Sequence, residues 1–117
     1  MFRAREILLY QTSGGNVPFN EWLFSLKDET TITRIWSRLD RLLLGNFGDC
    51  KKVSGGIYEL RFHFGPGYRV YFGLDGDEFV ILLSGGTKQT QQGDIELAKT
   101  RWKHHLGASG QELKNEK

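Results

Sequence analysis

The sequence predicts a mixed α+β domain in which helices pack on one side of a largely antiparallel sheet, in two layers. Three observations lead to this fold class. Apolar residues recur at helical spacing between Pro18 and Leu43, the period changes to two from Ile57, and short turns at 65–67 and 75–76 divide the alternating stretches. The predicted order is strand, helix, helix, strand, strand, strand, helix.

Residues 2–10 are predicted to form the first strand, which Gly14 and Gly15 bring to an end. A helix can begin at Pro18, because the N–H that proline lacks would have no partner in the first turn. An apolar stripe at positions i, i+3, i+4 and i+7 follows, made of Phe19, Trp22, Leu23 and Leu26. This spacing predicts a short helix.

The second helix has the clearest pattern. Asp28 supplies a cap and a carboxylate at the positive end, and Gly45 is a favourable C-terminal stop. The helical period between them is kept by Ile32, Ile35, Trp36, Leu39, Leu42 and Leu43. Three basic residues fall outside this stripe: Arg34, Arg38 and Arg41. Trp22 and Trp36 both lie on apolar stripes, so we interpret them as core residues.

Three alternating strands follow, from Ile57 to Leu83. If the turn at 65–67 closes a tight hairpin, Phe62 lies opposite Val70. The turn at Asp75-Gly76 then places Ile81 beside Val70. Both faces of the third strand are apolar, which predicts that it is covered on both sides.

The last predicted helix begins near 92–94 and carries apolar residues on one side as far as Leu106. The stretch 107–117 has little apolar content, so we predict a disordered C-terminal tail. Residues 1–106 are predicted to form a single domain, since 117 residues suit one hydrophobic core.

Composition excludes several classes of protein. No apolar run approaches the roughly 20 residues that cross a bilayer, and no apolar leader follows Met1. The single cysteine, Cys50, forms no internal disulfide, and no Cys/His cluster has the spacing of zinc ligands. We therefore expect a cytoplasmic protein without a membrane segment, metal or cofactor. The net charge of +2 is too small to indicate nucleic-acid binding by itself.

The placement of the charges is more informative. The face of the strands turned away from the predicted core carries Glu59, Arg61, His63, Arg69 and Tyr71. Lys88 follows the third strand, and Lys51 and Lys52 precede the first. An ordinary solvated strand face has the same alternation, and Glu59 with Arg61 can be a surface ion pair worth ~0.2–1 kcal/mol. Like charges on adjacent strands nevertheless repel unless an anion lies among them.

These residue types suit RNA cleavage by the RNA's own 2′-OH group, without a metal. Arginine's planar fork fits phosphate oxygens, so Arg61, Arg69 and Lys88 would stabilise the charge that builds on the phosphate. His63 or Glu59 would move protons. The remaining residues would bind RNA. Tyr71 would stack on a base, and Lys51 and Lys52 would contact the phosphate backbone of the RNA.

In this order and spacing, the chain resembles the addiction-module killer proteins of the RelE/ParE toxin superfamily, from about Val17 to Leu106. The resemblance is carried by Pro18-Phe19 with Trp22-Leu23, by 38–49, by Glu59-Leu60-Arg61, by 65–72 and by 82–88. It implies a two-layer RelE-like fold, a cognate antitoxin as partner, and messenger RNA on the ribosome as substrate.

The resemblance also implies roles for particular residues. Arg69 matches an arginine that stabilises the cleavage transition state, Lys88 matches a basic residue after the last strand, and Arg61 matches one of a basic pair. Glu59 stands where the other member of that pair is basic, and Asp94 stands where RelE carries a tyrosine. His63 could compensate.

Two other readings stay open. ParE-type members of the superfamily share the fold without the catalytic set and act on DNA gyrase. A catalytically silent protein that only binds a partner is the third hypothesis.

Overall fold

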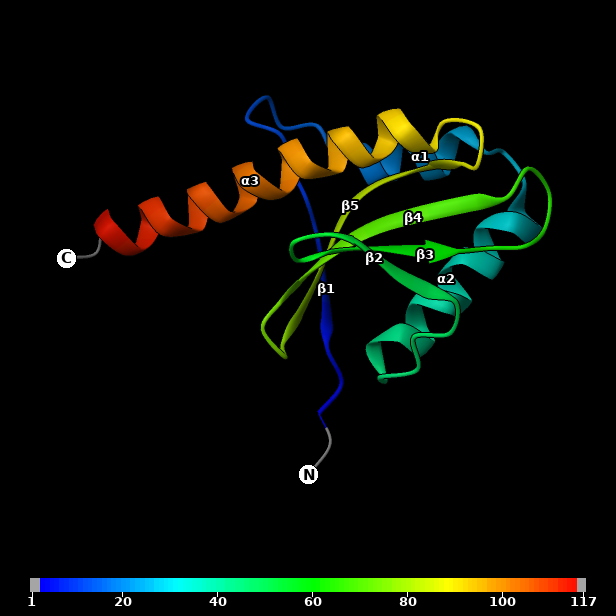
Figure 1. The fold of residues 1–117 in the computed structure, drawn as a ribbon, viewed down its shortest axis with the longest axis horizontal. Coiled ribbons are helices and arrows are strands. Elements are labelled where there is room, and N and C mark those ends of the chain that lie inside the picture. Colours follow the sequence, from blue (N-terminus) through cyan, green and yellow to red (C-terminus); the bar gives the residue numbers. More distant parts are fainter. Residues whose placement is uncertain (1–2, 116–117) are drawn as a thin grey trace.

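The structure is a computed structural model that describes the backbone of residues 3–115 and the side chains as far as Gly107. Its elements follow the chain as β1 (Glu6–Leu9), α1 (Pro18–Ser25), α2 (Glu29–Leu43), β2 (Cys50–Ser54), β3 (Ile57–Arg61), β4 (Tyr68–Asp75), β5 (Phe79–Thr87) and α3 (Gln91–Asn115). Figure 1 shows these elements in space. Pro18 occupies the first turn of α1, and the Asp28 side chain caps α2 by accepting from the Thr30 N–H, as predicted.

The five strands form one sheet in the order β1-β5-β4-β3-β2. The β1 and β5 strands run parallel, and every other neighbouring pair is antiparallel. The mixed α+β class with a largely antiparallel sheet packed on two N-terminal helices is therefore confirmed. Strand β2 was not predicted, because this short edge strand lacks apolar alternation and carries Lys51 and Lys52 at its centre.

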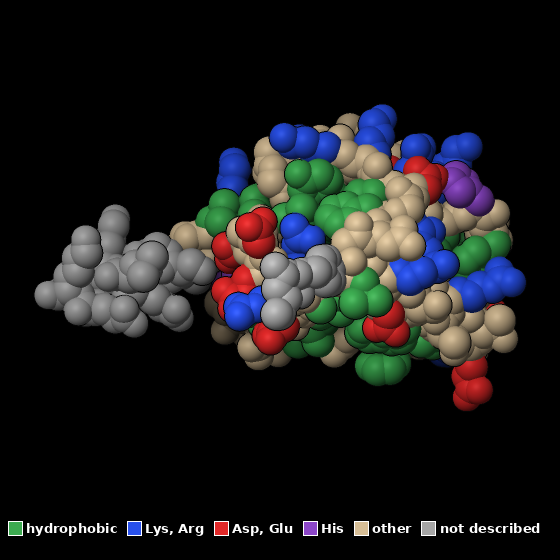
Figure 2. All heavy atoms as spheres, turned by 90° about the horizontal axis from the view of Figure 1, so that it is seen from below, with side chains coloured by type: hydrophobic (Ala, Val, Ile, Leu, Met, Phe, Trp, Pro, Cys, Tyr) green, Lys and Arg blue, Asp and Glu red, His purple; other side chains and the backbone are tan. Residues whose placement is uncertain are grey.

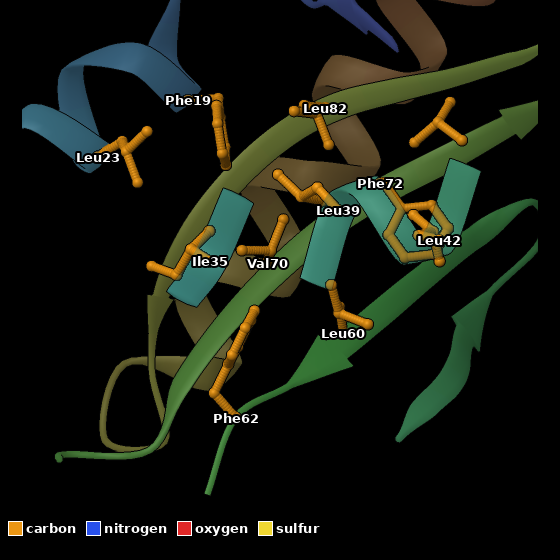
Figure 3. Packing of buried hydrophobic residues seen from close by; sticks show 11 residues of the cluster. Phe19, Leu23, Ile35, Leu39, Leu42, Leu60, Phe62, Val70, Phe72 and Leu82 are labelled. Atoms are coloured by element: carbon orange, nitrogen blue, oxygen red, sulfur yellow. The ribbon is translucent and has the colours of Figure 1, made fainter. Parts of the chain in front are cut away.

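Helices α1 and α2 cover one face of the sheet with apolar side chains. Figure 3 shows Ile35, Leu39 and Leu42 of α2 directed at the strands. Their partners include Leu60, Val70, Phe72 and Leu82, and these residues are essentially inaccessible. Trp22 and Trp36 pack against this cluster as predicted.

The third helix lies on the opposite face, which differs from the expectation that all helices share one side. Ala98 and Trp102 of α3 pack with Ile57, Tyr71 and other apolar residues of the strands. Because α3 covers this face, the strand face predicted to be open is buried over much of its area.

The strand registers also differ from the prediction. Strand β3 ends at Arg61, which pairs with Arg69, so Leu60 and not Phe62 lies opposite Val70. The connection is longer than a three-residue turn, since β3 ends at Arg61 and β4 begins at Tyr68, and the Gly67 N–H donates to the Phe64 carbonyl (3.1 Å) within it. The β4–β5 register shifts between Tyr71 and Phe72.

The turn between β4 and β5 decides which side of β5 faces which helices: Asp75 pairs with Phe79, so residues 76–78 connect the strands and not the predicted two-residue turn at Asp75-Gly76. Phe72 pairs with Leu82, and Val80 and Leu82 face α1 and α2. Ile81 and Leu83 face α3. Strand β5 is thus covered on both faces, as predicted, but the two faces are exchanged.

Of the predicted tail at 107–117, the structure gives the backbone to Asn115 and no side chain beyond Gly107. The domain boundary at Leu106 and the disorder of the tail remain predictions. Within residues 3–115, no helix combines the length and apolar character needed to cross a membrane.

Candidate functional site

A buried carboxylate is the centre of the charged residues on the α3 face. Glu59 on β3 is fully inaccessible. Its Oε2 atom accepts hydrogen bonds from the Tyr71 hydroxyl (3.0 Å) and from Nε2 of Gln91 (2.7 Å). Its Oε1 atom lies 3.4 Å from Nε of Arg61 and 3.9 Å from Nε of Arg69. We refer to Glu59, Arg61, Arg69, Tyr71 and Gln91 as the Glu59 cluster.

Arg69 is held from several directions. Nη1 donates to the carbonyl oxygens of Gly67 and Tyr68, both at 3.1 Å, and weakly to that of Phe62. Only 4% of the residue is exposed. The Nη2 atom makes no hydrogen bond to a described residue, so one edge of the guanidinium is left for a further partner.

Lys88 and Arg69 both lie close to Gly67. The Lys88 N–H donates to the Gly67 carbonyl (2.8 Å). A Cβ placed on Gly67 would lie 3.4 Å both from Nη1 of Arg69 and from Cβ of Lys88. Gly67 therefore separates the two cationic residues, and its φ of +78° is one that glycine adopts without strain. The Lys88 side chain is exposed.

Glu59 and Tyr71 are buried, whereas the sequence predicted both on an open strand face. Tyr71 is fully buried in the cluster under α3, so its ring cannot stack on a base. Burial beside the Glu59 carboxylate raises the pKa of the Tyr71 phenol far above its usual value. Glu59 is inaccessible, so it is neither half of a surface ion pair nor within reach of a substrate proton. Both corrections follow from the cover that α3 provides.

His63 is not part of the Glu59 cluster. Strand β3 ends at Arg61, and the His63 ring instead hydrogen-bonds to the Asp49 carboxylate. This bond holds the pKa of Asp49 below its ordinary value. His63 lines a separate pocket with residues of α2, so the structure does not bring it to Arg69.

Lys51 and Lys52 are exposed on the edge strand β2, where they pair in register with Glu59 and Tyr58 of β3. Arg61 has a side chain that is one-third exposed (34%), and it links the buried cluster to the surface. These basic residues can meet an anion from solvent. Their RNA-binding role remains a prediction.

One member of the Glu59 cluster was not predicted from the sequence. Gln91, the first residue of α3, donates to Glu59 from 32 positions further along the chain. No local pattern marks this contact, because it depends on how α3 docks on the sheet.

The geometry allows the cluster to present positive charge at a fixed place. One carboxylate faces two guanidinium groups, and Oε1 of Glu59 and Nε of both arginines are buried without a well-aligned hydrogen bond. The Asp94 carboxylate also lies at this site, over Gly86, so the excess of positive charge that attracts an anion such as phosphate comes from Lys88 together with the two arginines. Among the described residues, no three His, Cys, Asp or Glu side chains are grouped so that they could hold a metal ion.

The fold and the Glu59 cluster together define a small α+β domain with charged side chains gathered between its sheet and its last helix. The chain belongs to the Gp49-like family: a family profile described as "Phage derived protein Gp49-like (DUF891)" matches residues 21–103. This is a family of addiction-module-like toxins. The matched stretch contains every member of the Glu59 cluster and Lys88.

The chain is also similar to an uncharacterized protein of Haemophilus influenzae. The two are 49% identical over 81 residues, which cover 69% of this chain and 82% of that protein.

Proposed function

We propose that this protein is a toxin of the RelE type, which cleaves messenger RNA on the ribosome without a metal and is neutralised by a cognate antitoxin. The proposal is supported by family membership and, above all, by one observation. Arg69 is fixed by three backbone carbonyls and a buried carboxylate, with Lys88 beside it.

In this proposal the 2′-hydroxyl of the RNA loses its proton to solvent, and its oxygen attacks the adjacent phosphorus to form a 2′,3′-cyclic phosphate. The bond to the 5′-oxygen breaks, and that oxygen takes up a proton from solvent. Negative charge builds on the phosphoryl oxygens during the attack. The free edge of Arg69 and the Lys88 ammonium would stabilise that charge, because donors fixed in advance need no reorganisation during reaction. Arg61, partly exposed next to them, would add a further cation.

Glu59 is a positioning residue in this scheme. It orients both arginine side chains and stays out of contact with substrate, since it is fully buried and accepts from Tyr71 and Gln91. This explains how an acidic side chain can stand at a position where the resemblance implies a basic one.

The alternative is a ParE-like inhibitor of DNA gyrase or a silent partner-binding protein. One observation favours it: Arg69 is almost closed to solvent and Glu59 entirely so. A site that stays closed would bind a partner at its surface without performing chemistry.

The test is inducible expression of the chain, followed by mapping of cellular RNA ends. Lys88→Gln is the most informative variant, because the exposed side chain can lose its charge without disturbing buried contacts. We expect cuts within translated messages that fall at least tenfold in Lys88→Gln, about 1.4 kcal/mol of transition-state stabilisation. The control Lys103→Gln removes an exposed charge on α3 and should cut like the wild type.

Growth arrest with intact RNA would replace the nuclease proposal by gyrase inhibition, which a supercoiling assay would detect. Absence of arrest would leave a partner-binding protein. Arg69→Lys, which keeps a charge but loses the planar fork, should also lose cutting while it retains helical circular dichroism.

A further inference from the structure

A second group of cations lies outside the Glu59 cluster, on α2. A pocket of about 300 Å³ is lined by Arg34, Ser37, Arg38 and Arg41 of α2 and by Phe62, His63 and Phe64. We call this the α2 pocket. Figure 2 shows lysine and arginine side chains gathered near a histidine at one end of the molecule, with apolar atoms between them.

Arg38 braces this region. Its Nη1 atom donates to the Arg61 carbonyl (2.9 Å), and its guanidinium lies 4.9 Å from the centre of the Phe62 ring. Gly48 leaves room for it, because a Cβ there would lie 3.1 Å from Nη2 of Arg38. Burial and the charge of Arg41 lower the pKa of Arg38, so this cation would be stabilised by an added anion.

Arg34 and Arg41 are free to bind a ligand. Both are exposed, and neither forms an ion pair within the part of the chain that the structure describes. The Arg34 guanidinium lies 4.7 Å from the centre of the Phe64 ring, which orients it without neutralising it. The nearby carboxylate, Asp49, is bound to His63. The α2 pocket therefore keeps an excess of positive charge.

The spacing suits a strand with repeated charges. Arg34 and Arg41 are seven residues apart on one helix. At a rise of ~1.5 Å per residue this is about 10 Å, longer than one phosphate group. Arginine forks bind phosphate oxygens in two-point contacts, so the row on α2 can follow consecutive phosphates.

We propose that the α2 pocket binds the phosphate backbone of a single RNA strand. It would hold the strand along α2 while another part of the strand meets Arg69 and Lys88. The choice of RNA as the ligand rests on the proposed function, whereas the anion site itself rests on the geometry of α2.

The test measures binding apart from cleavage. The probe is a single-stranded 2′-O-methyl RNA, which lacks the attacking hydroxyl, and its affinity is followed by fluorescence anisotropy over a range of salt concentrations. Removing two phosphate contacts with Arg34→Gln/Arg41→Gln should reduce the slope of log affinity against log salt by about 1.4, at ~0.7 per contact for single strands. The affinity at low salt should fall about tenfold.

The matched control is Lys99→Gln/Lys103→Gln, which removes the same charge from α3 and should leave the slope near that of the wild type. Thermal unfolding of both double variants should match the wild type, which excludes a loss of fold as the cause.

The proposal is overturned if the Arg34/Arg41 variant keeps the wild-type slope, if the control loses as much, or if the wild type does not bind the probe. Preferential binding of polyglutamate, lost in the same variant, would make the pocket a site for an acidic protein segment and would also overturn it. Cleavage of all-ribose RNA is read separately. If the slope changes in a protein that does not cut RNA, the α2 pocket is supported as an RNA-binding site and the nuclease function is contradicted.

Discussion

Helices α1 and α2 close one face of the sheet with aliphatic and aromatic side chains, whereas α3 closes the other with Trp102 at one end and Gln91 at the other. On the α3 face, Trp102 covers an apolar cluster and Gln91 donates a hydrogen bond to the buried Glu59 carboxylate. Apolar burial is non-directional and tolerates substitutions that conserve volume. A buried charge requires its partners in place. The first face thus supplies stability, and the second combines stability with fixed positive charge.

Each face also contains a glycine that admits a tryptophan ring. A Cβ on Gly85 would lie 2.2 Å from Cε3 of Trp22, and a Cβ on Gly73 would lie 2.2 Å from Cζ3 of Trp102. Both rings therefore pack directly on strand backbone. The docking of α1 and of α3 depends on these two positions, which makes them a matched pair for comparing the two faces.

The largest effect is expected on the α1 and α2 face. Leu39 is completely buried between α2 and the sheet, so Leu39→Ala should lower the free energy of unfolding by ~2–5 kcal/mol through lost burial and the cavity left behind. Urea denaturation measures this loss. Leu44→Ala is the control, because Leu44 is 61% exposed and its loss should change stability by no more than about 0.5 kcal/mol. Equal losses at the two positions would contradict the assignment of the core.

The next effect is expected in the Glu59 cluster. Glu59→Ala leaves the buried Arg69 guanidinium without its carboxylate and should lower the free energy of unfolding by ~3 kcal/mol, the lower end of the range for breaking a buried pair, because Arg61 is partly exposed. Glu59→Gln keeps an acceptor for Tyr71 and Gln91 and should lose less. If both variants unfold at the wild-type denaturant concentration, the cluster does not contribute to stability.

A smaller effect is expected from Gly73→Ala. The added methyl group displaces the Trp102 ring and should lower the free energy of unfolding by ~1–3 kcal/mol. Hydrogen exchange should become faster in α3 and stay slow in α2, because Trp102 docks only the third helix. In Gly85→Ala, hydrogen exchange should become faster in α1 and stay unchanged in α3, because Trp22 of α1 packs on Gly85. Identical exchange patterns for the two variants would show that the two faces are not independent.

The smallest effect is expected outside both faces, at the Asp49–His63 pair. The hydrogen bond from His63 lowers the folded-state pKa of Asp49 below the ordinary value of 3.8. Its contribution to stability is therefore present above about pH 4 and is lost as pH falls through the lowered folded value. Asp49→Asn should be slightly less stable than the wild type at pH 5, and the difference should shrink by pH 2.5. Urea denaturation at both pH values tests this, and a difference that grows with acidity would reverse the sign.

Local patterns were sufficient for the helices of the first face. The sequence alone predicts features that act through neighbours in the chain. These are the Asp28 cap, the apolar stripe from Ile32 to Leu43, and Pro18 at the start of α1. Strand β2 was not predicted, because an edge strand is stabilised by pairing with its neighbour and needs no alternation of apolar and polar residues.

The candidate site was predicted in part. Residues Arg61, Arg69 and Glu59 were expected on one face and are found there, because side-chain alternation along a strand is a local property. His63 was expected with them and lies elsewhere, since β3 ends two residues earlier. The prediction that Glu59 and Tyr71 are exposed was wrong, because their exposure depends on α3, which is distant in the chain and covers them.

The sequence by itself determined the class of fold, the order of helices and strands apart from β2, and the residues that alternate to one side of each strand. These follow from periodicity, capping and turn chemistry, which operate over a few residues. Only the tertiary structure decided that α3 crosses to the other face, that β4 and β5 shift register, and that Glu59 is buried beneath Gln91. Each of these depends on contacts between residues far apart in the chain, where the energy of packing two surfaces outweighs any local preference.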